Sequence, residues 1–260
     1  MPLGPDDVRL DGRVALVTGA AVGIGRATAL ALSRFGADVA ICDRDAEHLA
    51  EVAAEVEGLG RRVVQGVLDV RDGEQVTAWL AEVASAFDHV DVLVNNAGGG
   101  FMAAFVEVSD KGQDALIREN FTSVTSFVRG IVPLMPATGG SIVNVTSIEA
   151  HRAGPGFAVY SAMKAGQASL AQSLALELGP RMIRVNCVAP DVIPTPGIGK
   201  EMGVRTPLPR AGDVDDVAAA IVFLANPALS GFVTGTTVHV DGGNSAAGGW
   251  HRQPDGSYST

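Results

Sequence analysis

The segment Val14-Ala-Leu-Val-Thr-Gly-Ala-Ala-Val-Gly-Ile-Gly25 decides the fold of this 260-residue chain. Its first four residues form an apolar, β-branched run that predicts a buried strand, and a helical pattern begins directly after the last glycine. The glycines between them, Gly19, Gly23 and Gly25, let main-chain N–H groups approach a pyrophosphate at the positive end of that helix. The spacing differs from the common GxGxxG form but supplies the same backbone chemistry. This order of elements predicts a dinucleotide-binding α/β fold.

The same alternation of strand and helix patterns continues along the chain. Near-continuous apolar strands separated by helices are typical of a parallel sheet that is covered on both faces. We therefore predict one Rossmann-type, doubly wound domain over residues 1–260, with about seven strands and helices on both faces. A proline- and glycine-rich loop is expected at 190–210 and a surface tail at 244–260. The predicted strands are 14–17, 38–41, 63–67, 90–94, 141–145, 183–188 and 237–240, and the clearest helices are 26–35, 46–58, 74–87, 161–178 and 214–224.

Composition excludes several classes of protein. Apolar residues make up 47% of the chain and charged residues 18%, which predicts a folded globular protein. The formal net charge of −10 argues against nucleic acid and anionic membranes as partners. The longest apolar run, 217–225, is far too short for a membrane span, and no signal peptide is recognisable. Cys42 and Cys187 lie in apolar stretches and are interpreted as buried thiols rather than a disulfide or metal pair. We expect a cytoplasmic protein that binds a small molecule and no metal.

The second strand carries the signal for the choice of cofactor. It ends at Asp43, close to where an acidic side chain meets the ribose hydroxyls of a bound adenosine. A carboxylate there repels a 2′-phosphate, and the glycine loop offers no cation, since Val22 stands before Gly23. Arg44 is the one nearby cation and keeps NADP open as an alternative. The sequence predicts NAD as the cofactor.

Polar residues also follow the third and fourth strands, in Leu68-Asp69-Val70 and Asn95-Asn-Ala-Gly98. Open α/β sheets bind ligands at the carboxyl ends of their strands, so these residues are candidates for the cofactor site. Asn95 and Asn96 are equally common as turn formers.

A tyrosine and a lysine four residues apart open the helical pattern at 161–178. This spacing places Tyr160 and Lys164 on one helical face. A phenol with a pKa near 10 is a poor base unless a cation stabilises the phenolate, which Lys164 can do. Ser147 ends the fifth strand, where its hydroxyl can hydrogen-bond a substrate oxygen opposite the tyrosine. Asn120 is a candidate partner for a water in the proton path.

Together, Thr18-Gly19…Gly23-Ile-Gly25, Asn95-Asn-Ala-Gly98, Asn120, Ser147 and Tyr160…Lys164 resemble the short-chain dehydrogenase/reductase family, in its single-domain branch. The similarity runs from about Gly12 to Gly243. It implies a catalytic tetrad of Asn120, Ser147, Tyr160 and Lys164, with Tyr160 as general acid/base and Lys164 also on the nicotinamide ribose. It also implies a homotetramer. The implied cofactor contacts are Gly19, Val22, Gly23, Ile24, Gly25, Asp43, Arg44, Asp69, Val70, Asn95, Ala97, Gly98, Tyr160, Lys164, Pro190, Val192 and Thr195.

The chain departs from the family pattern at the end of the sixth strand, where Pro190-Asp191 replaces the usual Pro-Gly. Asp191 either places a carboxylate near the reactive end of the cofactor or points to solvent, and we expect solvent. The loop that follows is short, which favours a bulky or ring-shaped substrate. Glu149 and His151, with Arg152, form either a solvated polar loop or a site for a polar substrate group. Further candidates for the pocket are Ser147, Phe157 and Tyr160, with Phe101, Met102 and Met202 as apolar wall.

Three classes of function follow. The leading one is an NAD(H)-dependent alcohol dehydrogenase or ketone reductase, and Ser147-Ile-Glu149 resembles hydroxysteroid dehydrogenases. A sugar or polyol, or a 3-oxoacyl thioester, is the alternative substrate. The second class is a non-redox lyase such as a halohydrin dehalogenase; because those enzymes lack the glycine loop and the lysine, Gly19, Gly23, Gly25 and Lys164 argue against it. The third class is a sensor of NAD without turnover, and the complete tetrad argues against it because a sensor does not need one. The tail with Trp250, His251 and Tyr258 is expected to be a mobile end rather than part of a neighbour's pocket.

Overall fold

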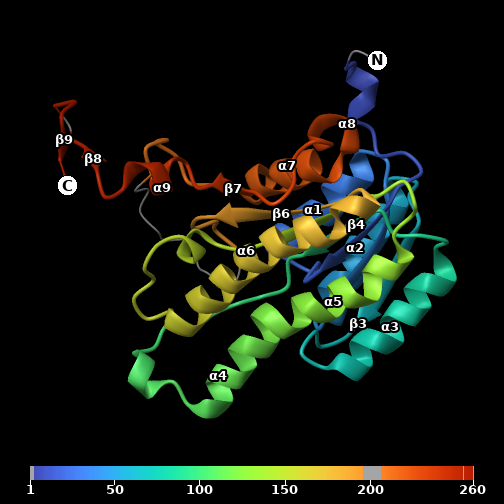
Figure 1. Cartoon of the computed structure of the whole chain (residues 1–260), viewed down its shortest axis with the longest axis horizontal. Helices are drawn as coiled ribbons and strands as arrows, with labels where there is room; N and C mark the ends of the chain where they lie inside the picture. The colour runs from blue at the N-terminus through green and yellow to red at the C-terminus, as the bar shows by residue number, and fades with distance from the viewer. Residues whose placement is uncertain (1–2, 196–205, 254, 260) are drawn as a thin grey trace.

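The computed structural model describes residues 3–195, 206–253 and 255–259. In these ranges seven parallel strands form one sheet, in the order β3-β2-β1-β4-β5-β6-β7 (Figure 1). The chain runs outward from β1 to β3 and then returns to the other side of β1 with β4. The predicted doubly wound sheet is confirmed. Its switch point between β1 and β4 is where such sheets bind nucleotides.

Every predicted strand is present, and its ends lie within two residues of the expected ones. The most informative difference between the predicted and observed strand ends is at β6. This strand continues through Pro190, where the predicted loop begins. Pro190 pairs with Val240 of the edge strand β7, while the pairing of β6 with β5 ends at Val188, so a residue without an N–H group interrupts no pairing with β5. The strands are β1 (Val14–Thr18), β2 (Asp38–Asp43), β3 (Val63–Val67), β4 (Val92–Asn95), β5 (Gly140–Val145), β6 (Ile183–Pro190) and β7 (Thr237–Val240).

The five predicted helices are confirmed as α1 (Gly23–Arg34), α2 (Ala46–Gly58), α3 (Gly73–Ala86), α6 (Ala158–Leu178) and α7 (Val214–Ala225). A further helical region between β4 and β5 was not predicted. It consists of α4 (Asp110–Ile117), a π-helical turn (Arg118–Thr122) and α5 (Ser123–Ile131). Shorter helices are α8 (Pro227–Ser230) and α9 (Asn244–Ala247).

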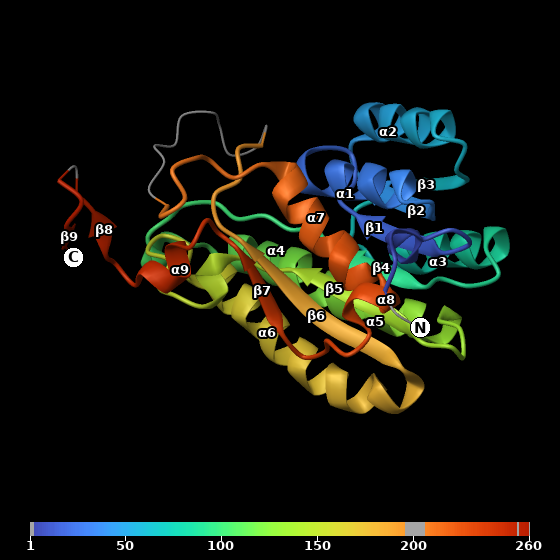
Figure 2. The same cartoon turned by 90° about the horizontal axis from the view of Figure 1, so that it is seen from above.

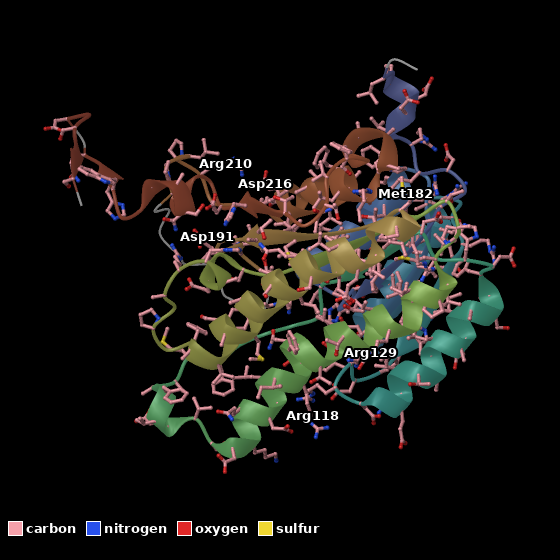
Figure 3. All side chains as sticks on the ribbon, in the orientation of Figure 1. Arg118, Arg129, Met182, Asp191, Arg210 and Asp216 are labelled. Atoms are coloured by element: carbon pink, nitrogen blue, oxygen red, sulfur yellow. The ribbon has the colours of Figure 1, made fainter. Side chains whose placement is uncertain are left out.

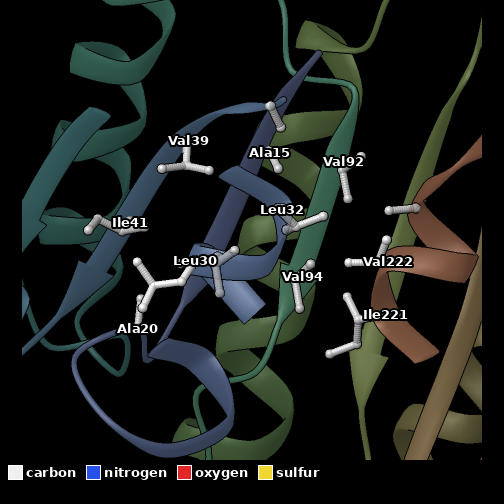
Figure 4. Close-up of a cluster of buried hydrophobic side chains, with 14 of the residues drawn as sticks. Ala15, Ala20, Leu30, Leu32, Val39, Ile41, Val92, Val94, Ile221 and Val222 are labelled. Carbon is white, nitrogen blue, oxygen red and sulfur yellow. The ribbon is translucent and has the colours of Figure 1, made fainter. Parts of the chain in front are cut away.

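Two apolar layers hold the helices on the sheet. Successive strand residues face opposite sides, so Ala15 and Val17 of β1 pack with α1, α2 and α7, while Val14 and Leu16 pack with α3, α5 and α6. The first layer is drawn in Figure 4, where Leu30 and Leu32 of α1 lie over the strands and Ile221 and Val222 approach from α7. Both faces of the sheet are therefore buried, as the continuous apolar strands predicted.

The C-terminal segment extends away from the sheet. After α9, strands β8 (His251–Arg252) and β9 (Tyr258–Ser259) pair as a short antiparallel hairpin, which projects from the body in Figure 2. Trp250 and His251 are exposed, as a surface tail predicts. Within the described ranges, no helix has both the length and the apolar character that crossing a membrane requires.

Candidate active site

Three glycines shape the turn between β1 and α1. Gly19 and Gly23 have φ angles of 66° and 61°, the left-handed region that side chains disfavour. A Cβ atom on Gly25 would lie 1.9 Å from the carbonyl oxygen of Gly19. Aspartates cap the starts of α2, α3 and α7, but α1 follows Val22 without a side-chain cap. The first N–H groups of α1 are therefore left for an anionic ligand, which fits a dinucleotide pyrophosphate.

Asp43 lies at the end of β2, against this turn. One carboxylate oxygen accepts a hydrogen bond from the Ala21 N–H at 3.0 Å, and the other accepts from the Asp45 N–H at 3.1 Å. The carboxylate is thus held by the main chain on both sides, next to the glycine turn. Arg44 is exposed beside it. This arrangement fits the predicted role of Asp43 toward the adenosine ribose.

The two asparagines that follow β4 have different surroundings. Asn95 is 2% exposed, and its side-chain nitrogen donates a hydrogen bond to the side-chain oxygen of Asn144 at 2.8 Å. Its side-chain amide is therefore directed into the core, toward β5. Asn96 instead donates to the main-chain carbonyls of Thr18 and Gly19, each at 2.9 Å. Asn96 holds the glycine turn in place, and the residue-type signal that marks turn formers did not distinguish it from its neighbour.

The neighbouring cofactor candidates lie around the same turn. Ala97 donates its N–H to the Thr18 hydroxyl at 3.0 Å, and its Cα atom closes against Gly19. Asp69 makes a two-pronged ion pair with Arg71, which lowers the pKa of the Asp69 carboxyl. Val70 is partly buried and packs on the apolar layer between the sheet and the helices α3, α5 and α6.

The four predicted catalytic residues come from three segments of the chain. Ser147 follows β5, Tyr160 and Lys164 lie in the first two turns of α6, and Asn120 lies in the π-helical turn. Lys164 is 3% exposed, and its ammonium donates to the Val145 carbonyl at 2.7 Å. The Lys164 nitrogen lies 5.7 Å from the centre of the Tyr160 ring. The structure therefore brings Tyr160 and Lys164 together at the carboxyl end of β5.

Asn120 connects this group to the segment after β4. Its side-chain nitrogen donates to the Gly99 carbonyl at 2.8 Å, and its side-chain oxygen accepts from the Gly99 N–H at 3.2 Å. Gly98 lies so close that a Cβ atom there would be 3.0 Å from the Lys164 nitrogen. A Cβ atom on Gly100 would be 3.1 Å from the Tyr160 ring. The segment 98–100 thus covers the tyrosine and the lysine without side chains of its own.

Burial controls the ionisation of both groups. It lowers the pKa of Lys164 to about 8, because the ammonium has lost most of its hydration. Burial raises the pKa of Tyr160, the charge of Glu149 raises it further, and a hydrogen bond with Ser147 opposes both. Burial is thus the largest influence on the pKa of Tyr160 in this structure, and it disfavours the phenolate.

The residues after β6 lie close to the glycine turn, although their sequence positions are far from it. Thr195 is so near Gly23 that a Cβ atom on the glycine would be 3.1 Å from the threonine methyl group. Val192, like Thr195, is partly buried. The expectation that Thr195 faces the cofactor site is therefore compatible with its position.

Asp191 does not point to solvent, and that expectation is wrong. Its side chain is only 9% exposed. One oxygen accepts a hydrogen bond from the Asn244 side chain of α9 at 2.6 Å, and the other faces the Arg152 guanidinium at 3.5 Å. Asp191, Arg210 and Asp216 line a cavity of about 320 Å³ at this end of the molecule, and all three are labelled in Figure 3. The contacts with two other segments, which the sequence does not reveal, bury the carboxylate.

The loop between β5 and α6 supplies the predicted substrate side chains. The Phe157 ring meets the Tyr160 ring edge-on, with centroids 6.3 Å apart. Glu149 forms an ion pair with Arg152 at 3.0 Å, and His151 packs on His239 of β7 at 4.8 Å between ring centroids. Phe157 and Glu149 are therefore near the tyrosine, whereas His151 faces the edge strand.

Other candidate residues have different surroundings. Phe101 and Met102 are exposed; a Cβ atom on Gly156 would touch Met102, whereas the Phe101 ring lies against Gly112 of α4. Met202 lies outside the described residues. Cys42 and Cys187 are free and buried, as predicted. No group of three or more potential metal ligands occurs in the described ranges.

Known proteins resemble this chain over most of its length. A family model described as enoyl-(acyl carrier protein) reductase matches residues 19–245. The 3-oxoacyl-[acyl-carrier-protein] reductase FabG of Thermotoga maritima is 40% identical over 244 residues, which cover 91% of this chain and 99% of that protein. Carveol dehydrogenase from Mycobacterium avium, solved with NAD, aligns with a TM-score of 0.83 at 32% identity, covering 90% of this chain and 98% of its own. A short chain dehydrogenase from Burkholderia cenocepacia, solved with NADP, aligns with a TM-score of 0.86 at 34% identity, and the alignment covers 90% of this chain and 98% of that protein.

Proposed function

Because this chain belongs to the short-chain dehydrogenase/reductase family of oxidoreductases, we propose that it interconverts a secondary alcohol and a ketone with NAD(H). The observation that carries the proposal is the placement of Tyr160 beside Lys164 and Ser147, at the switch-point side of the sheet. A nicotinamide cofactor, when bound, takes up or supplies the hydride of this reaction. The chain's own residues then have to bind the cofactor, orient the substrate oxygen and move its proton.

Tyr160 is the proposed general acid/base, whose hydroxyl takes the proton from the alcohol or returns it to the ketone. Ser147 is proposed to hold the substrate oxygen from the other side, because its oxygen accepts a hydrogen bond from the Glu149 N–H and its O–H can then donate to the substrate. Lys164 favours the phenolate by its charge, and its pKa of about 8 keeps it mostly protonated at neutral pH. Asn120 maintains the segment 98–100 over both groups. In this assignment the tetrad works as one unit.

NAD is the proposed cofactor because of the charge next to the adenosine site. The Asp43 carboxylate is held at the glycine turn by Ala21 and Asp45, where it would repel a 2′-phosphate. Solved relatives bind either NAD or NADP, so this carboxylate is the feature that decides the proposal. We expect kcat/KM to be at least ~10-fold higher with NAD than with NADP, from a repulsion of about 1–2 kcal/mol.

The proposed substrate is a bulky or cyclic alcohol. The aromatic ring of Phe157 next to Tyr160, with exposed Met102 against the same loop, offers an apolar wall for a ring-shaped molecule. The similarity to a 3-oxoacyl-thioester reductase favours a second candidate, reduction of such a thioester. A sugar or polyol is a third candidate, for which the polar pair Glu149 and Arg152 provides partners. A cytoplasmic homotetramer stays a prediction.

The test follows the absorbance of reduced cofactor while the purified protein is offered NAD or NADP. The panel contains hydroxysteroids, cyclic and linear alcohols, polyols and 3-hydroxyacyl thioesters. Tyr160→Phe should lower kcat by about 10²- to 10⁴-fold while NAD binding, measured by fluorescence, is unchanged. NAD binding without turnover of any member would contradict the enzymatic proposal and favour a sensor of NAD.

A further inference from the structure

Gln167 carries a buried side-chain amide, and no sequence pattern identified this residue as functional. It lies on α6, one turn beyond Lys164, and its side chain is 0% exposed. Burying an amide costs free energy unless new hydrogen bonds replace those made with water. The partner of this amide therefore indicates what the residue does.

That partner is the main chain of Asn120. The Gln167 side-chain nitrogen donates to the Asn120 carbonyl oxygen. The orientation of the amide follows from the chemistry, since a carbonyl oxygen can only accept a hydrogen bond. The carbonyl lies in the π-helical turn, where the Ser123 N–H bonds to Arg118 five residues back rather than four. Single π turns disturb the regular hydrogen-bond ladder of a helix and often occur at functional sites.

The contact leads to the reacting groups in two further steps. Asn120 is itself 0% exposed, and its side chain holds Gly99 by two hydrogen bonds of opposite direction. The glycines on either side of Gly99 lie so close to these groups that a Cβ atom on Gly98 would be 3.0 Å from the Lys164 nitrogen and one on Gly100 would be 3.1 Å from the Tyr160 ring. Gln167 thus supports, through Asn120, the segment 98–100 that covers Lys164 and Tyr160.

We propose that Gln167 is a positioning residue of the catalytic centre, which fixes the Asn120 main chain and through it the cover over Tyr160 and Lys164. The role in turnover rests on the proposed dehydrogenase function. An apolar side chain of similar volume would fill the same space in the core. The amide is therefore explained by its bond to Asn120, and not by packing.

The first experiment compares Gln167→Leu with Gln172→Leu, the same change at an exposed position of the same helix. The Gln167 variant should lower kcat by about 10-fold, because it leaves the buried Asn120 carbonyl without this partner. The KM for NAD should change by less than about 3-fold, since the glycine turn is untouched. As the cover loosens, water reaches both groups, so the limb of the kcat–pH profile that reflects Lys164 should move to higher pH and the limb that reflects Tyr160 to lower pH. The Gln172 variant should behave as the parent.

A spectroscopic measurement needs no substrate. The chain contains two tyrosines, Tyr160 and Tyr258, so tyrosinate absorbance in a Tyr258→Phe background reports Tyr160 alone. Burial raises the pKa of Tyr160, and Gln167→Leu should therefore lower the midpoint of this titration. If no alcohol is oxidised, the proposed function fails, and the titration still decides the positioning role.

Gln167→Glu separates positioning from a structural role. A protonated acid can donate its O–H to the Asn120 carbonyl, whereas the carboxylate cannot. The ratio of the variant's kcat to the parent's is therefore expected to be close to 1 at low pH and to fall as the pH rises through the carboxyl pKa. If Gln167→Leu fails to fold by circular dichroism, this variant decides alone. A folded Leu variant with the parent's kcat, pH profile and Tyr160 midpoint, or a Glu variant with no such pH dependence, overturns the proposal.

Discussion

The glycine turn between β1 and α1 differs in construction from the proposed catalytic face at the start of α6, called the catalytic face below. The turn relies on missing side chains, because Gly25 approaches the Gly19 carbonyl closer than any Cβ atom allows. The catalytic face relies on side chains that are buried although polar, with Asn120 and Lys164 almost inaccessible. The first region is therefore specified by shape, and the second by the desolvation of functional groups. The two should respond differently to substitution.

Among the substitutions that compare the two regions, the largest effect on NAD binding is expected for Gly25→Ala. The new methyl group would lie 1.9 Å from a main-chain oxygen, so the turn has to shift. We expect at least ~100-fold weaker NAD binding by calorimetry, equivalent to about 3 kcal/mol, because the main-chain donors move away from the pyrophosphate. Gly58→Ala is the matched control, since its added methyl group meets nothing within 4 Å. Unchanged NAD affinity in a folded Gly25→Ala protein would contradict the shape argument.

Lys164→Met should separate stability from activity on the catalytic face. Burial lowers the Lys164 pKa from 10.5 to about 8, so folding at neutral pH includes the cost of burying a charge. That cost is ~3 kcal/mol, is fully present below pH 8, decreases as the pH rises, and vanishes above the unfolded pKa near 10.5. The variant should therefore unfold at higher temperature than the parent at pH 7, yet lose turnover.

The control for this prediction is the pH dependence itself. The difference in melting temperature between Lys164→Met and the parent should shrink between pH 8 and pH 10.5. A variant that is less stable than the parent at pH 7 would show that the lysine contributes more through its bond to Val145 than its burial costs.

The smallest effect is expected for Asp191→Gly, which restores the residue usual in the family. Asp191 accepts one bond from Asn244 and faces Arg152, so its loss frees α9 and the β5–α6 loop but touches neither the glycine turn nor Tyr160. We expect a 2- to 5-fold change in the KM for the alcohol, of order 0.5–1 kcal/mol, with the KM for NAD unchanged. A larger change in the KM for NAD would place Asp191 with the cofactor region instead.

The two regions also differ in how far they could be predicted. The glycines, Asp43 and the Tyr160–Lys164 spacing act within one or two neighbouring elements, so local patterns were enough to find them. The different directions of the Asn95 and Asn96 side chains could not be predicted, because two adjacent strand-end asparagines differ only in which face of the sheet they occupy. Asp191 was expected in solvent because its partners, Arg152 and Asn244, are far away in the chain. Gln167 could not be found, because its partner is a main-chain carbonyl.

The sequence by itself determined the alternation of strands and helices, the glycine turn and the residue types of the catalytic face, because hydrophobic period and short motifs are local properties. The tertiary structure decided which polar groups are buried and what each one contacts. Parallel strands bring segments that are 20 to 80 residues apart to one edge of the sheet, as the bonds from Asn120 to Gly99 and from Asn96 to Thr18 show. Burial and pKa depend on those long-range neighbours, and no local pattern records them.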